Sequence, residues 1–80
     1  MVYFLIRGSH IKIGRTVDLD RRLSSFQQTR NDVLATVPGG QAVENEWHRR
    51  FAHLRDTSVY GGKEWFRAAD ELLSAIAAVA

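Results

Sequence analysis

Two short apolar segments near the N-terminus, residues 2–6 and 11–13, constrain the fold most strongly. They are rich in β-branched, aromatic and aliphatic side chains, which are typical of strands. Gly8 and Ser9 lie between them and suit a two-residue hairpin turn. The sequence therefore predicts that the chain begins with a tight antiparallel hairpin.

The register of this hairpin sorts its side chains into two groups, because successive strand residues point to opposite faces of a sheet. One face receives apolar side chains: Val2, Phe4, Ile6, Ile11 and Ile13. The other face receives a mixed set: Tyr3, Leu5, Arg7, His10, Lys12 and Gly14. On this second face a phenol, an ammonium group and a bare backbone lie side by side, and a slip of one residue would separate them.

The remaining segments alternate between helical and extended patterns. The predicted elements are a helix over 18–28, a strand over 33–37, a helix over 41–54, a short extended segment over 64–68 and a final helix over 70–80. We expect one α+β (α/β) domain over residues 1–80, with a small three-stranded antiparallel sheet flanked by helices. The expected order is ββαβα, then the short extended segment and the C-terminal helix.

Composition limits the classes of protein to which the chain can belong. The 45% apolar content is that of an ordinary globular protein, and no apolar run approaches the ~18 residues that a membrane span needs. We therefore expect no membrane partner. Met1 runs directly into a strand-like segment and the chain has no Cys, so we expect no secretory signal, disulfide or thiolate zinc site, and a cytoplasmic location.

The positive charge is unevenly distributed along the chain. The net charge is only +2, but residues 1–40 contain six Lys and Arg against three Asp, whereas residues 41–80 contain five against six acidic residues. The basic excess therefore lies in the half that contains the hairpin and the first helix. Such clustering is compatible with a nucleic-acid partner, although a small excess of this kind also occurs in proteins that bind none.

Glu44 and His48 lie four residues apart on the second predicted helix, at the border of its apolar stripe. Side chains at such a border can project into a cleft. Glu46 is followed by Arg49 and Arg50 and is expected to be a solvent-exposed ion-pair partner instead. From the residues alone, Glu44 is either an ordinary boundary carboxylate or a functional group, and His48 either a hydrogen-bonded boundary residue or a group that orients a substrate.

Three residues around the first helix are candidates for binding a phosphate. Gly14 and Arg15 open the turn into this helix, where free backbone N–H groups can bind an anion. Arg22 lies among apolar neighbours, so its planar guanidinium either reaches to water or binds an anion through two parallel hydrogen bonds.

Taken in order, these motifs resemble those of the GIY-YIG nuclease superfamily over nearly the whole chain. The first motif reads "MVY" and contains Tyr3, and the second reads "KIG" and contains Lys12 and Gly14. The family's helix arginine falls on Arg22 and its metal-binding glutamate on Glu44. The closest resemblance is to a compact phage and bacterial branch that has "KIG" in place of "YIG" and later patterns such as "ENEWHRRF" and "EWF".

The chain also departs from the pattern of this superfamily. Met1 takes the place of the first motif's glycine, Lys12 that of the second motif's tyrosine, and Phe26 that of an accessory His or Tyr. The late asparagine of many members is not evident. The replacements at Lys12 and Phe26 affect groups that can transfer protons.

The resemblance implies a metal-dependent endonuclease that hydrolyses DNA. One Mg²⁺ or Mn²⁺ would be held by Glu44, and Arg22 would neutralise charge on the phosphate. The water would be activated by Tyr3 or Lys12, and Lys12 is otherwise only a phosphate-binding cation.

Further residues are expected to contact the substrate: Gly14, Arg15 and Arg7 would bind the nucleic acid, and His48 would orient the substrate or a water molecule. So small a domain has few elements left to read bases, so we expect low specificity or a helper domain or protein. Two alternatives remain open. One is an inactive nucleic-acid-binding module of the same fold, and the other is an interaction domain that uses the Ala-rich face of the last helix.

Overall fold

A four-stranded antiparallel sheet forms the middle layer of the chain, which a computed structural model describes over residues 1–80. The strands, in the spatial order β3-β1-β2-β4, are β1 (Val2–Arg7), β2 (His10–Arg15), β3 (Val33–Val37) and β4 (Trp65–Arg67). The helices are α1 (Leu19–Ser25), α2 (Gln41–Arg50) and α3 (Asp70–Val79). This ββαβαβα order confirms the predicted α+β class. None of the three helices is long and apolar enough to cross a bilayer.

The pairing of β1 with β2 has the predicted register. Tyr3 lies opposite Gly14, and Leu5 lies opposite Lys12. Gly8 has a φ of 58°, a left-handed conformation that glycine adopts without steric cost and that a tight hairpin turn requires. The separation into an apolar and a mixed face is therefore confirmed.

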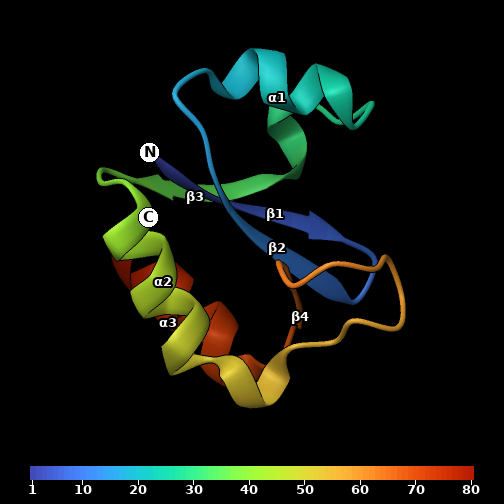
Figure 1. Ribbon diagram of the computed structural model, residues 1–80, viewed down its shortest axis with the longest axis vertical. Coiled ribbons are helices and arrows are strands. Elements are labelled where there is room, and N and C mark those ends of the chain that lie inside the picture. The colour runs from blue at the N-terminus through green and yellow to red at the C-terminus, as the bar shows by residue number, and fades with distance from the viewer.

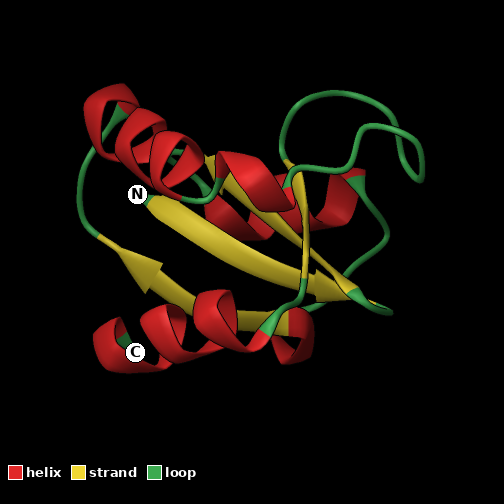
Figure 2. Cartoon of the chain, turned by 90° about the horizontal axis from the view of Figure 1, so that it is seen from below, coloured by secondary structure: helices red, strands yellow, loops and turns green.

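Each face of the sheet is covered by different helices, as Figures 1 and 2 show: α1 lies on one side, and α2 and α3 lie on the other. The larger core lies under α2 and α3 and includes Phe4, Phe66 and Leu72, each 0% exposed. A smaller core under α1 consists of Tyr3, Leu5, Leu19 and Leu23. The mixed face of the hairpin is therefore only partly covered, by one short helix.

The sheet has a fourth strand, where the sequence predicts three strands and a separate extended segment. Trp65–Arg67 pairs with His10–Lys12 along the outer edge of β2. A three-residue segment carries too little periodicity to be recognised as a strand, and its pairing depends on a partner more than 50 residues away. The chain segment before β4 is thereby held against β2.

Two helices are shorter than predicted. The first ends at Ser25 rather than near residue 28, because Gln27 adopts a left-handed φ of 57° and the N–H of Gln28 donates to the carbonyl of Leu23. This is the hydrogen-bond pattern of a helix C-cap. The second helix ends at Arg50 and continues as a 3₁₀ turn over Ala52–Leu54.

The anchoring role of β4 can be tested through Phe66, which is fully buried. Phe66→Ala should lower the free energy of unfolding by about 3–5 kcal/mol, because it leaves a cavity in the larger core. Val59→Ala, at a position 47% exposed, should change it by less than about 0.5 kcal/mol. Equal small effects of both substitutions, measured by urea denaturation, would show that β4 is not anchored in the core.

Candidate active site

The outer edge of β2 is open beyond Lys12, where its pairing with β4 ends. At the next residue, Ile13, the backbone N–H donates to the carbonyl of Glu64 at 2.9 Å. The Ile13 carbonyl accepts a hydrogen bond from Nε2 of His48 at 2.8 Å. A side chain of α2 therefore replaces the missing strand partner and fixes this helix against the sheet edge.

Two carboxylates, here called the acid pair, meet at this open edge: Glu44 from α2 and Glu64 from the segment before β4. Their oxygens and a ring nitrogen of His48 all lie within 4.8 Å of one another. The Glu44 side chain is only 15% exposed. Burial raises the pKa of Glu44 above its ordinary value, and the negative charge of the nearby Glu64 is the second-largest cause of this increase. Two carboxyl groups so close together favour either a shared proton or a bound cation.

His48 is held from both sides of its ring. Nε2 donates to Ile13, and Nδ1 lies 3.4 Å from Nη2 of Arg55, which can only donate. The ring also packs at 5.1 Å from that of Phe66, as measured between centroids. Both ring nitrogens of His48 therefore have a partner, and the oxygens of the acid pair are the available ligands for a hard cation.

Tyr3 lies directly over the backbone of Gly14. A Cβ atom at position 14 would lie 2.5 Å from the Tyr3 hydroxyl and 2.6 Å from Cζ, so only glycine leaves room for the phenol. Burial raises the pKa of Tyr3 to about 12; Glu64 and Glu44 act in the same direction, and Arg22 opposes them. The phenol therefore keeps its proton at neutral pH.

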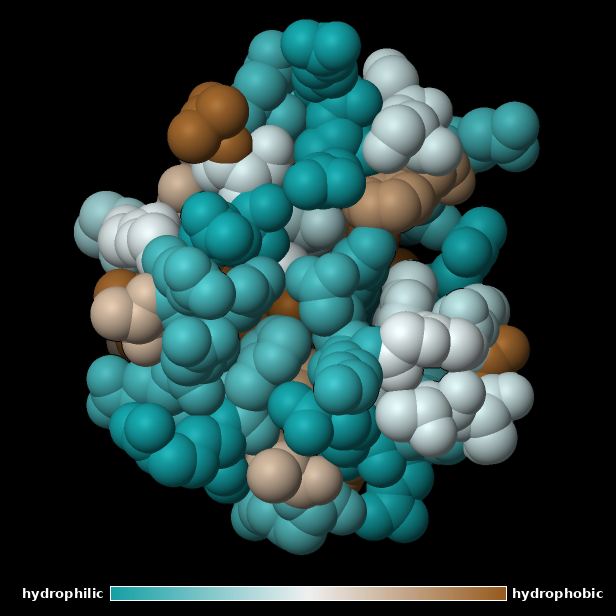
Figure 3. Space-filling model, in the orientation of Figure 1, coloured by the Kyte–Doolittle hydropathy of each residue, from teal (hydrophilic) through white to brown (hydrophobic).

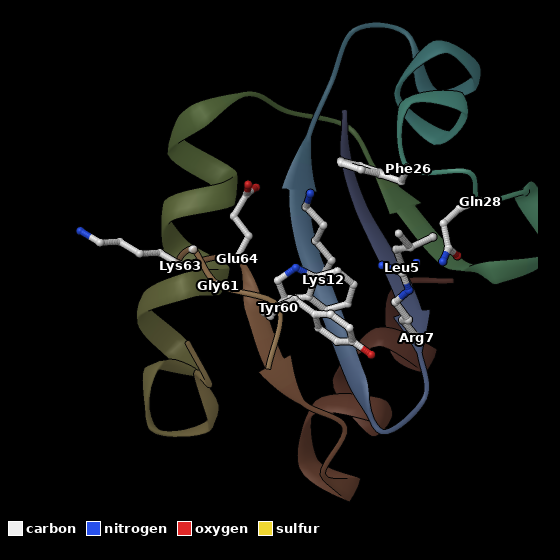
Figure 4. Close-up of a pocket in the computed structure, with 11 residues that line it drawn as sticks. Leu5, Arg7, Lys12, Phe26, Gln28, Tyr60, Gly61, Lys63 and Glu64 are labelled. Carbon is white, nitrogen blue, oxygen red and sulfur yellow. The ribbon is translucent and has the colours of Figure 1, made fainter. Parts of the chain in front are cut away.

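Lys12 projects from the same face of β2 between aromatic rings and carboxylates. Its Nζ lies 3.6 Å from the centroid of the Phe26 ring, and Figure 4 shows its side chain beside that of Glu64. Burial lowers the pKa of Lys12, Arg22 lowers it further, and Glu64 and Glu44 oppose the shift. Burial thus acts in opposite directions on the two predicted candidate bases, Tyr3 and Lys12.

The predicted phosphate-binding arginines lie around this cluster. Nε of Arg15 lies 3.9 Å from Oε1 of Glu44, and the Arg15 side chain is 47% exposed and accessible to a ligand. Arg22 is close enough to Tyr3 and Lys12 to affect the pKa of both groups. Arg15 and Arg22 also line a common pocket of about 320 Å³ next to Gly39.

Arg7 lies apart from the other predicted site residues, at the turn end of β1. Its Cζ is 5.3 Å from the centroid of the Tyr60 ring, and both residues line a different pocket, which extends to Lys12 and Glu64 (Figure 4). The structure therefore brings together the acid pair, Tyr3, Lys12 and the two arginines Arg15 and Arg22, whereas Arg7 belongs to a neighbouring pocket.

Glu64 is part of the sequence motif "EWF", but the sequence did not predict that this residue lies beside Glu44. Its placement depends on β4 pairing with β2, which brings residue 64 beside Ile13. The available signal was an acidic residue directly before a short apolar segment.

A comparison with protein-family models matches residues 1–80 to the T5orf172 domain. The chain belongs to the T5orf172 domain family. This family is GIY-YIG-like, which agrees with the resemblance of the sequence motifs. The searches of curated proteins and of solved structures found no match to this chain. The roles of its individual residues, and the subdivision by the "KIG" motif, stay predictions.

The contact between Tyr3 and Gly14 can be tested by a double-mutant cycle. Gly14→Ala should lower the free energy of unfolding by about 1–3 kcal/mol, because the new methyl group overlaps the phenol. In a Tyr3→Leu background, which lacks the overlapping atoms, most of this loss should disappear. Gly40→Ala, where a Cβ would meet nothing within 4 Å, is the control. Additive effects of the two substitutions would contradict the contact.

The raised pKa of Glu44 gives the acid pair a pH signature in the absence of metal. A carboxyl group whose pKa is higher in the folded state stabilises folding below its ordinary pKa of 4.5 and loses that contribution as pH rises. In EDTA at pH 7, Glu44→Gln should therefore raise the melting temperature, and this gain should vanish below about pH 4.5. Glu46→Gln, at an exposed position of the same helix, should have little effect. An unchanged or lower melting temperature of Glu44→Gln at pH 7 would show that the charge of Glu44 does not destabilise the folded state.

Proposed function

We propose that this T5orf172 domain is a metal-dependent endonuclease that hydrolyses phosphodiester bonds of DNA. The observation that carries the proposal is the meeting of an acid pair with Lys12, Arg15 and Arg22 at one open sheet edge. Phosphodiester hydrolysis needs both kinds of group, because the substrate is anionic and its transition state gains further negative charge. Figure 3 shows that the face of the molecule seen in the orientation of Figure 1 is mostly hydrophilic.

The acid pair fits a single Mg²⁺ or Mn²⁺ ion. Carboxylate oxygens are the preferred ligands of these ions, which commonly bind through one or two carboxylates together with substrate phosphate. The raised pKa of Glu44 supports this assignment, because a cation would relieve the repulsion between Glu44 and Glu64. When bound, the ion would supply charge stabilisation to the leaving oxygen.

The phosphate would be bound on the basic side of this cluster. Arg22 would stabilise the developing charge on the non-bridging oxygens, and Arg15 and the backbone near Gly14 would hold the neighbouring phosphate. Arg15 lies 3.9 Å from Oε1 of Glu44, so a phosphate bound by Arg15 would lie next to a metal ion held by the acid pair. His48 would contact neither the metal nor the substrate. Its hydrogen bond to the Ile13 carbonyl would orient α2, the helix that carries Glu44.

The directions of the pKa shifts favour Lys12 over Tyr3 as the group that accepts the proton of the attacking water. A pKa of about 12 leaves almost no phenolate at neutral pH, whereas burial and Arg22 move Lys12 toward its neutral form. Tyr3 would then orient the water by hydrogen bonding.

An inactive nucleic-acid-binding module is the second candidate function. The high pKa of Tyr3 and the complete hydrogen bonding of His48 favour it, because neither group is poised for proton transfer. Both candidates predict salt-dependent DNA binding, so metal-dependent cleavage separates them.

The test is cleavage of supercoiled plasmid by the purified domain with Mg²⁺ or Mn²⁺, compared with EDTA. Wild type should nick the plasmid only with metal, and Glu44→Gln should abolish nicking while retaining DNA binding. Arg22→Ala should slow it about 10²- to 10³-fold through the loss of a donor to the developing charge. Glu46→Gln is the matched control on α2.

Retained nicking by Glu44→Gln would refute the assignment of the acid pair. Metal-independent DNA binding without cleavage, on plasmid, branched and single-stranded substrates, would support the inactive module instead.

A further inference from the structure

A pocket of about 400 Å³ lies beside the acid pair and shares Lys12 and Glu64 with the proposed active site, whereas its wall at Tyr60 has no role in the proposed chemistry. Leu5 and Lys12 form its floor, and Figure 4 shows Phe26 and Gln28 on one side and Tyr60 on the other. Its volume lies within the range of small-ligand sites. Because Lys12 and Glu64 line this pocket and Glu64 belongs to the acid pair, a molecule bound here would lie next to the proposed active site.

Tyr60 is held in the pocket wall, although it lies in a loop. Its ring packs at 4.4 Å from that of Trp65 and at 5.9 Å, edge to face, from that of His10. The base of the loop is closed by a hydrogen bond from the Asp56 N–H to the Trp65 carbonyl at 2.9 Å, and the Asp56 side chain bonds His10 at 3.0 Å. Even so, Tyr60 is 41% exposed, so the loop presents an aromatic surface to the pocket.

We propose that this pocket binds one unpaired nucleotide of the substrate, with its base stacked on an aromatic wall and its phosphate near a cation. Base stacking on aromatic rings needs no sequence recognition and is characteristic of single-strand binding. Three cations line the pocket against one carboxylate, Glu64, and their charge matches that of the nucleotide's phosphates: Arg7, Lys12 and Lys63. The inference rests on the proposed function, because it takes the substrate of the neighbouring site to be nucleic acid.

The proposal specifies a substrate class. A base within a duplex is covered on both faces by its neighbours, so it can enter the pocket only after it has left the stack, and this costs a few kcal/mol for a paired base. A nucleotide that is already unpaired avoids that cost. The domain should therefore prefer DNA with an unpaired nucleotide next to the cleaved bond, such as a gap, flap or bulge.

The test measures binding in EDTA, where no cleavage is expected. One probe is a DNA duplex with a single unpaired 2-aminopurine, whose fluorescence falls when the base stacks on an aromatic ring, and the other is the fully paired duplex. Wild type should bind the unpaired probe about 5- to 150-fold more tightly and quench its fluorescence. Tyr60→Ala should lose both effects, whereas Tyr60→Phe and the neighbouring Val59→Ala should keep them.

Equal affinity for both probes, unchanged by Tyr60→Ala, would overturn the pocket assignment and leave the proposed function intact if the plasmid is still nicked. Absence of binding to either probe at low salt would overturn both proposals. An unchanged circular dichroism spectrum and melting temperature of Tyr60→Ala would show that its loss of both effects does not come from unfolding.

Discussion

The pairing of Tyr3 with Gly14 across β1 and β2 is the constraint on which the site depends. The absence of a side chain at position 14 leaves room for the phenol against the strand backbone, and the same register places Lys12 on that face. A shift of one residue would turn the phenol and the ammonium group into the larger core. The two-residue turn at Gly8 therefore determines the chemistry of a surface several residues away.

The late start of β4, at Trp65 opposite Lys12, is the second condition for the site. A full-length edge strand would cover β2 beyond Lys12 and exclude α2 from the edge of the sheet. Because β4 begins only at Trp65, the Ile13 carbonyl is left for His48, and this hydrogen bond brings Glu44 to the same edge as Glu64. The short length of β4 thus leaves the outer edge of β2 open, and the acid pair, Lys12 and Arg15 lie close together at this edge.

The local structure could be predicted from the sequence, and so could the positions of Glu44 and His48 on one side of the second helix. Alternation and the turn gave the hairpin register, and helical spacing placed Glu44 beside His48. The fourth strand, Glu64 in the acid pair and the wall formed by Tyr60 could not be predicted, because each depends on one distant contact between the segment around residues 55–67 and the hairpin. A three-residue strand and a glycine-containing loop carry no periodicity that would reveal such contacts.

The most direct test of the central claim is the anomalous scattering of Mn²⁺ in crystals of the domain. The account predicts one anomalous peak between the carboxylates of Glu44 and Glu64, within coordination distance of both, and its loss in Glu64→Gln. A structure with full Mn²⁺ occupancy elsewhere, and with these carboxyl groups hydrogen bonded directly to each other, would contradict it. The acid pair would then be a proton-sharing contact of the fold and not a metal centre.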